Sequence, residues 1–270
     1  MTTRNWRVKK TRLRCSDPIL CSINTSTTSY TPSTLTISTY TSIGNSTWEA
    51  PAYVTSVEYL IVGGGGGGGA AYDTGSAGGG GGGLVLYGTM SVTPGNTYNI
   101  TVGDGGDGGV GDRNNTPSEY NGSNGLDSIF DSITAYGGGG GYNSRTTNGN
   151  SGLGGSVATS TTAPTGGNGA GNRVGGENGG GGGGNTTAGG SSNSTALVSR
   201  TGGAGLTSTI SGSSVTYGAG GSGGIVDTSS DGSSASNNTG NGGGGATSVS
   251  SDSKSGGKGG SGIVILKYYI

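Results

Sequence analysis

The sequence predicts an all-β protein in which a small β-sandwich or clasp is joined to a polyglycine-II-like bundle, without significant helix. Three observations lead to this fold class. Glycine accounts for 68 of 270 residues, much of it in unbroken runs. Short β-prone segments stand before and after the glycine-rich region. No segment shows a sustained apolar period of 3.6 residues, and a glycine in a helix costs about 1 kcal/mol relative to alanine.

The glycine runs predict extended chains that pair through their backbones. A polyproline II chain repeats every three residues without internal hydrogen bonds, so its amides and carbonyls can bond neighbouring chains. Glycine lets such chains come close together. The alternative interpretation is disorder, because low-complexity glycine and serine without a period usually do not order; the flanking strands favour order. The runs lie at 63–69, 78–83, 137–141, 179–184 and 242–245.

The β-prone segments are expected to gather the two ends of the glycine region. Residues 54–62 alternate and then become continuously apolar, which is typical of a strand entering a buried position. Residues 262–269 contain four consecutive aliphatic residues and predict a strand buried on both faces. Residues 84–92 and 97–102 predict a hairpin around a type II turn at Pro94-Gly95. Shorter strands are expected at 35–40, 128–136 and 214–217, and an exposed polar loop at 229–236.

Residues 1–44 are predicted to form a separate leader, followed by a glycine-rich domain over 45–270, with its β clasp at 45–103 and 262–270. The leader places six basic residues before the first acidic one, Asp17. This arm could dock on an acidic protein surface, remain a solvated tail or bind phosphate. An aromatic residue among arginines favours docking, and the net charge of −1 argues against a nucleic-acid binder. The attachment candidates are Arg4, Trp6, Arg7, Lys9, Lys10, Arg12 and Arg14.

Composition excludes several other classes of protein. No apolar stretch reaches the roughly 18 residues that a membrane helix needs, and no apolar region follows the basic N-terminus as in a signal peptide. Cys15 and Cys21 are the only cysteines. They make a poor zinc site without histidine partners, and the sequence leaves open whether they form a disulfide.

The sequence offers no catalytic centre, so we expect a protein that is not an enzyme and uses no cofactor or metal. Histidine, the commonest general base, is absent. The glycine runs lack the Gly-Lys-Ser/Thr ending of a phosphate-binding loop. Asp104, Asp107 and Asp112 lie in a glycine-rich stretch, but their spacing matches neither an EF-hand nor a calcium-binding β-roll.

Two aromatic-bearing loops interrupt or follow the glycine runs. Tyr72 and Asp73 lie between the first two runs, and Tyr142 and Arg145 follow the third. Tyrosine beside small polar residues is typical of binding loops, because it combines rigid aromatic area with adaptable hydrogen bonding. These four residues are the candidates for receptor binding. In the alternative interpretation, the tyrosines only cap the ends of the bundle.

Several motifs occur together in an order that resembles a known family. They are Thr47-Trp48-Glu49-Ala50-Pro51, Tyr59-Leu60-Ile61-Val62 running into Gly63, Val92-Thr93-Pro94-Gly95, Tyr136 running into Gly137, and the ending Gly262-Ile263-Val264-Ile265-Leu266-Lys267-Tyr268. In this order, residues 46–270 resemble the glycine-rich domain of bacteriophage tail-fibre and related virion proteins.

The resemblance implies a structural protein of the virion, assembled in the host cytoplasm. Its bundle would present variable loops to a host receptor or glycan, as a tail fibre or adhesin does, and its arm would join other virion proteins. Homo-oligomers are also compatible with this interpretation. Two alternatives stand beside it: a capsid-mounted fibre or decoration protein without a specific receptor, and an ice-binding polyglycine bundle. The irregular intervals between the runs argue against the ice-binding alternative.

Overall fold

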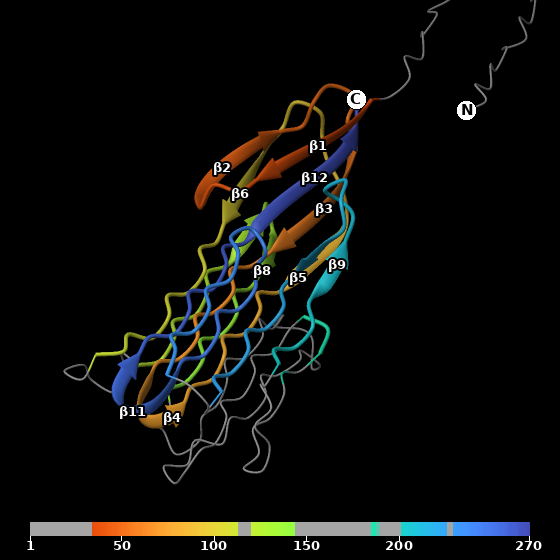
Figure 1. Cartoon of the computed structure of the whole chain (residues 1–270). Helices are drawn as coiled ribbons and strands as arrows, with labels where there is room; N and C mark the ends of the chain where they lie inside the picture. Colours follow the sequence, from red (N-terminus) through yellow and green to blue (C-terminus); the bar gives the residue numbers. More distant parts are fainter. Residues whose placement is uncertain (1–33, 113–119, 144–184, 188, 190–200, 226–228) are drawn as a thin grey trace, which may run out of the picture. The chain divides into compact units, whose positions relative to one another are not determined.

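The computed structural model describes residues 34–112, 120–143, 185–187, 189, 201–225 and 229–270, without the side chains of Asp73 and Thr74. All of them belong to one unit of the chain, Thr34–Ile270. The described part is all-β and contains no helix, as the sequence predicts (Figure 1). It therefore holds no helix of the length and apolar character that crossing a membrane requires.

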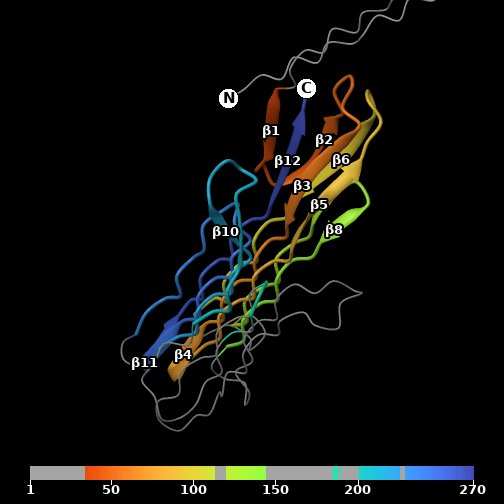
Figure 2. The same cartoon turned by 90° about the vertical axis from the view of Figure 1, so that its right-hand side faces the viewer.

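Two four-stranded antiparallel sheets form a small sandwich at one end of the unit (Figures 1 and 2). The first sheet runs in the order β1 (Leu35–Tyr40), β12 (Ile263–Tyr269), β3 (Ser56–Val62) and β5 (Val85–Ser91). The second runs in the order β2 (Gly44–Glu49), β6 (Thr97–Val102), β7 (Ser128–Phe130) and β8 (Ile133–Ala135).

Buried and exposed side chains alternate along the strands, and the buried ones form the core of the sandwich. One cluster of buried side chains includes Trp48, Ile100 and Phe130 from the second sheet and Val264 and Leu266 from the first. A second cluster lies on the other face of the first sheet, beneath the hairpin of β9 (Leu206–Ser208) and β10 (Val215–Tyr217). Strand β12 contributes to both clusters, so the prediction that it is buried on both faces is confirmed.

The predicted hairpin of residues 84–92 and 97–102 is wrong. The turn between them forms, because the amide of Asn96 donates to the carbonyl of Thr93 over 3.1 Å and Gly95 has a φ of 77°. However, β5 pairs with β3 in the first sheet, whereas β6 pairs with β2 and β7 in the second. Two backbone hydrogen bonds join the turn to Ala50, and Val92 is buried between the sheets. The turn therefore carries the chain from one sheet to the other.

The start of the described chain is part of the sandwich. Strand β1 pairs with β12 along its whole length, from Leu35 opposite Tyr269 to Tyr40 opposite Val264. Residues 34–44, which were predicted to belong to the leader, thus contribute β1 to the first sheet. The rest of the leader, residues 1–33, lies outside the described residues.

The glycine runs form a hydrogen-bonded bundle with a three-residue repeat. In segment 63–70, residues 63, 66 and 69 donate to segment 78–84, residues 64, 67 and 70 donate to segment 120–126, and residues 65 and 68 donate to segment 257–260. The donor–acceptor distances lie between 2.7 and 3.0 Å. Each successive amide therefore points about a third of a turn further around the chain, as a polyproline II helix requires.

The carbonyls of the same segment bond three other neighbours. Residues 64 and 67 accept from segment 138–141, residues 65 and 68 from segment 106–109, and residues 66 and 69 from segment 243–246. Segment 63–70 is thus surrounded by six chains, three antiparallel and three parallel to it. The polyglycine-II-like bundle that the sequence predicts is present.

Close packing explains why the central positions are glycine. A Cβ on Gly66 would lie 2.1 Å from the carbonyl oxygen of Gly139, and one on Gly67 would lie 2.0 Å from that of Asp107. Real Cβ atoms essentially never approach another heavy atom to less than 3.0 Å. The absence of a side chain is therefore what allows each backbone to reach the hydrogen-bond acceptors of its neighbours.

Residues 229–236 are polar and mostly exposed, as expected, but they form an outer chain of this bundle rather than a free loop. Ser230 pairs with Thr247, the amide of Gly244 donates to Ser233, and that of Ala235 donates to Lys258. Ser233, Ser234 and Ser236 are exposed. Serine is tolerated where a chain has no neighbour on one side, so polar residues here mark the surface of the bundle rather than a loop.

Candidate functional site

Side-chain oxygens accept hydrogen bonds from backbone amides along one row of the bundle. Asn121, Asn124 and Asp127 are spaced by three residues, one turn of the extended helix, and therefore face the same way. Their Oδ1 atoms accept from the amides of residues 143, 140 and 137 at 3.0, 2.9 and 2.8 Å. This row of side chains, the Asx ladder, supplies an acceptor to every third amide of segment 137–143.

Among the three residues of the Asx ladder, Asn121 is expected to contribute most to stability. Its Oδ1 also accepts from the side-chain amide of the buried Asn143 at 2.7 Å. Asn121→Leu should lower the free energy of unfolding by about 1–3 kcal/mol, because it removes an acceptor used by two partly buried donors. Asn121→Asp keeps the acceptor and serves as the control in chemical denaturation. Equal stability of the leucine and aspartate variants would contradict the assigned role.

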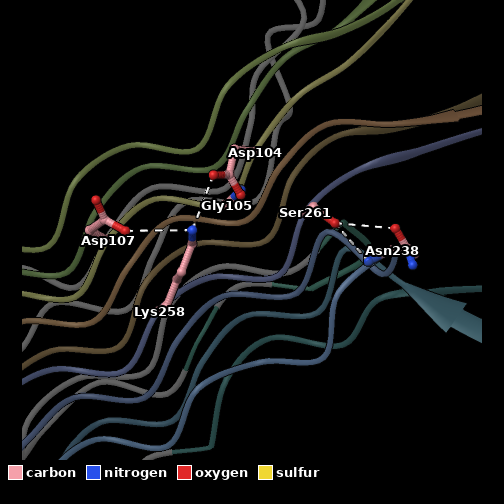
Figure 3. A network of polar contacts seen from close by, with 6 residues as sticks. All are labelled: Asp104, Gly105, Asp107, Asn238, Lys258 and Ser261. Atoms are coloured by element: carbon pink, nitrogen blue, oxygen red, sulfur yellow. Dashed lines mark hydrogen bonds and ion pairs between the residues drawn. The ribbon is translucent and has the colours of Figure 1, made fainter. Parts of the chain in front are cut away.

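A second polar network lies along segment 103–109 (Figure 3). Lys258 donates to Asp104 Oδ2 over 3.1 Å and lies 3.6 Å from Asp107 Oδ1. The hydrogen bond to Asp104 raises the pKa of the Lys258 ammonium above its usual value. The two carboxylates face one lysine because they stand one three-residue turn apart. Among the described residues, no three acidic, cysteine or histidine side chains lie together as a metal site would need.

Strand β4 (Ala71–Ser76), which carries Tyr72, lies at the end of the bundle opposite the sandwich (Figures 1 and 2). Tyr142 lies close to this strand, because its carbonyl accepts from the amide of Gly78. Segment 63–70 continues into β4, which pairs antiparallel with β11 (Thr247–Lys254). The register shifts between Val249 and Ser253, so β11 bulges opposite Asp73. Ser248 Oγ donates to the carbonyls of Ser250 and Asp252 at 2.9 and 2.8 Å and thereby fixes the bulge. We call this end, formed by β4, β11 and the last residues of segments 103–111 and 137–143, the bundle tip.

Tyr72 is half-buried on β4 and packs on another tyrosine. Its ring centroid lies 6.2 Å from that of Tyr120, with the two planes tilted by 42°. Tyr120 is buried, and its hydroxyl donates to the carbonyl of Asp112 over 2.6 Å. Tyr72 therefore covers part of the bundle tip while a part of its own surface stays accessible.

Tyr142 is held differently. Its carbonyl accepts from the amide of Gly78 over 2.9 Å, and the next residue, Asn143, is fixed by the Asx ladder. On the other side of the tyrosine, the amide of Gly141 donates to Gly67 over 2.8 Å. The backbone is thus anchored on both sides, whereas 41% of Tyr142 remains exposed. An exposed aromatic ring on a fixed backbone loses little conformational entropy when it binds a partner.

The other predicted site residues are outside what the structure describes. Arg145, the attachment candidates between Arg4 and Arg14, and Cys15 and Cys21 lie beyond the described residues, as does the side chain of Asp73. The described structure therefore brings Tyr72 and Tyr142 to the bundle tip. The tip also exposes Val110 and Val249, at 53% and 41%, which the sequence analysis did not select.

Comparison with known proteins agrees with the glycine-rich architecture. A family model described as a glycine-rich domain matches residues 39–269, which is most of the chain. A search of curated proteins finds no match.

Proposed function

We propose that this chain, which belongs to the glycine-rich domain family, is a non-enzymatic structural protein of a bacteriophage particle. In this proposal it acts as a tail fibre or adhesin whose bundle tip recognises the host surface. The recognition residues are Tyr72, Asp73, Tyr142 and Arg145, and the partner is a cell-surface receptor or glycan. The protein is assembled in the host cytoplasm and functions on the virion.

The observation that carries this proposal is the exposed ring of Tyr142 on a backbone anchored in the bundle. In the core of the bundle the amides and carbonyls are hydrogen-bonded to neighbouring chains. The described surface of the bundle exposes mostly short polar side chains. Specific binding needs side chains with area and directional polarity, and tyrosine provides both. At the tip, Tyr142 presents such a side chain, and the exposed valines Val110 and Val249 add apolar area.

Tyr142→Ala is expected to weaken adsorption of the particle to its host about tenfold, which corresponds to about 1.4 kcal/mol of binding energy. The melting temperature of the purified domain should not change, because the removed ring is partly exposed and its backbone bonds remain. Tyr87→Ala is the matched control: Tyr87 is also exposed, at 69%, but lies on β5 in the sandwich.

Two results would count against recognition at the tip. If adsorption is unchanged in the Tyr142→Ala particle, the chain is a fibre or decoration protein whose tip has no receptor. If adsorption falls only together with thermal stability, Tyr142 is a structural cap.

The basic arm is proposed to attach the domain to another virion protein. Its six arginine and lysine residues and Trp6 precede the folded unit, which begins at Thr34. Deleting residues 1–33 should leave a folded domain, because β1 is retained, but incorporation into particles should be lost. Normal incorporation of the truncated chain, measured by quantitative mass spectrometry of purified particles, would show that attachment lies elsewhere.

A further inference from the structure

Strand β1 forms an edge of the first sheet, and its outer side has no partner among the described strands (Figures 1 and 2). The backbone hydrogen bonds within the described part of the chain show which groups of β1 point away from β12. Thr34 and Ile270 exchange both of their bonds, at 2.7 and 3.0 Å. Bonding pairs alternate along an antiparallel ladder. The amides and carbonyls of Leu35, Ile37 and Thr39 therefore point away from β12.

The other edges of the two sheets carry features that discourage pairing with another strand. Strand β2 has a charged residue, Glu49, and β8 is only three residues long. At the start of β5, the outward amide of Val85 donates to the side chain of Asn185 over 3.0 Å. Short strands, charges and covered backbone groups are the usual means of protecting a sheet edge.

Among the described residues, strand β1 has none of these protections. Its sequence, Leu-Thr-Ile-Ser-Thr-Tyr, contains no charge and no proline, and its pairing with β12 has no bulge. Apolar side chains are exposed beside it: Leu35 is 47% exposed, and Tyr269, which lies directly opposite on β12, is 54% exposed. An uncharged edge without a bulge and with exposed apolar neighbours is a template for an added strand.

We propose that the added strand is β1 of a second copy of this chain, paired antiparallel about a two-fold axis at Ile37. This register places Ile37 opposite Ile37 and Leu35 opposite Thr39 of the other copy. All of these residues direct their backbone bonds outward, so the two edges satisfy each other without a shift. No charged side chains meet. The first sheet of one copy and the first sheet of the other become one continuous eight-stranded sheet.

Self-complementarity is the reason for choosing a second copy as the occupant. An isologous contact must use the same patch on both partners. With the axis at Ile37, each outward-facing residue of β1 lies opposite an outward-facing residue of the other copy. The contact is a single short strand pair with little side-chain area, so the dimer should be weaker than one with a standard-sized interface. We expect a dissociation constant on the order of tens of micromolar, because so small an interface belongs with weak and transient contacts.

The test is sedimentation of the full chain over a range of concentrations, compared with two proline variants. Thr39→Pro removes an outward amide and no bond to β12, and Thr39 is an exposed residue. The Thr39→Pro substitution should weaken the dimer at least about tenfold, because the added strand loses a hydrogen bond and clashes with the proline ring. Thr47→Pro, the same change at an exposed position of the edge strand β2, should leave the dimer unchanged. A chain that stays monomeric at all concentrations, or a dimer that Thr39→Pro does not weaken, would overturn the proposal.

Amide hydrogen exchange of the unmodified chain tests the pairing of β1 with a second copy even if Thr39→Pro fails to fold. The amides of Leu35, Ile37 and Thr39 should exchange quickly in dilute protein and slowly in concentrated protein. Those of Thr36, Ser38 and Tyr40, which face β12, should be slow in both. Outward amides that exchange equally fast at both concentrations would overturn the proposed pairing.

Discussion

Gly66→Val is expected to destabilise the domain by more than about 4 kcal/mol, the range of severe overpacking, and so to prevent folding at ordinary temperatures. The Cβ would lie 2.1 Å from the carbonyl oxygen of Gly139, and that atom belongs to a backbone bonded to further chains. Neither chain can move aside without breaking hydrogen bonds to other neighbours, because segment 63–70 is surrounded on six sides.

Gly88→Ala is the matched control for the valine variant. Gly88 lies in β5, and a Cβ there would meet only the hydroxyl end of the Tyr59 side chain, at 2.7 Å. This side chain can shift, so the change in stability should stay below about 1.5 kcal/mol. Thermal unfolding followed by circular dichroism compares the two. Similar melting temperatures for Gly66→Val and the unmodified chain would show that the runs are not packed.

Phe130→Ala should have the second largest effect, about 3–5 kcal/mol, from lost apolar burial and the cavity left behind. Phe130 is fully buried between the two sheets, and its ring contacts those of Trp48, Tyr59 and Tyr98 at centroid distances of 6.1, 6.3 and 6.2 Å. Aromatic pairs in this range contribute beyond their buried area.

The control for the core variant is Leu126→Ala, since Leu126 is 60% exposed. Its substitution should change stability by no more than about 0.5 kcal/mol. Denaturant unfolding gives both values. A Phe130→Ala domain as stable as the Leu126→Ala domain would mean that the two sheets do not share the core assigned to them.

Local patterns predicted most strands, whereas their partners depended on distant contacts. The four aliphatic residues of β12 indicate burial on both faces, and the structure confirms it. The Pro94-Gly95 turn is also local and forms as predicted. The predicted hairpin failed because Ala50, far away in the sequence, binds this turn and directs β6 to β2.

In the bundle, too, the local structure could be predicted, whereas the neighbours of each chain could not. Glycine runs predict a three-residue repeat, but nothing in segment 63–70 indicates which six chains surround it. The spacing of Asn121, Asn124 and Asp127 was visible in the sequence and could have predicted the Asx ladder once that repeat was assumed. The exposure of Val110 and Val249 could not have been predicted, because it depends on where their chains end at the bundle tip.

The central claim is that the glycine runs form a hydrogen-bonded lattice that holds the bundle tip in place. Hydrogen exchange with mass spectrometry on a peptide covering residues 63–70 tests it most directly. Every amide in this segment donates to a neighbouring backbone carbonyl. We expect them to exchange as slowly as the amides of β12 and to open only with global unfolding. Exchange at the rate of an unstructured glycine peptide would contradict the lattice and the rigid presentation of Tyr142 that depends on it.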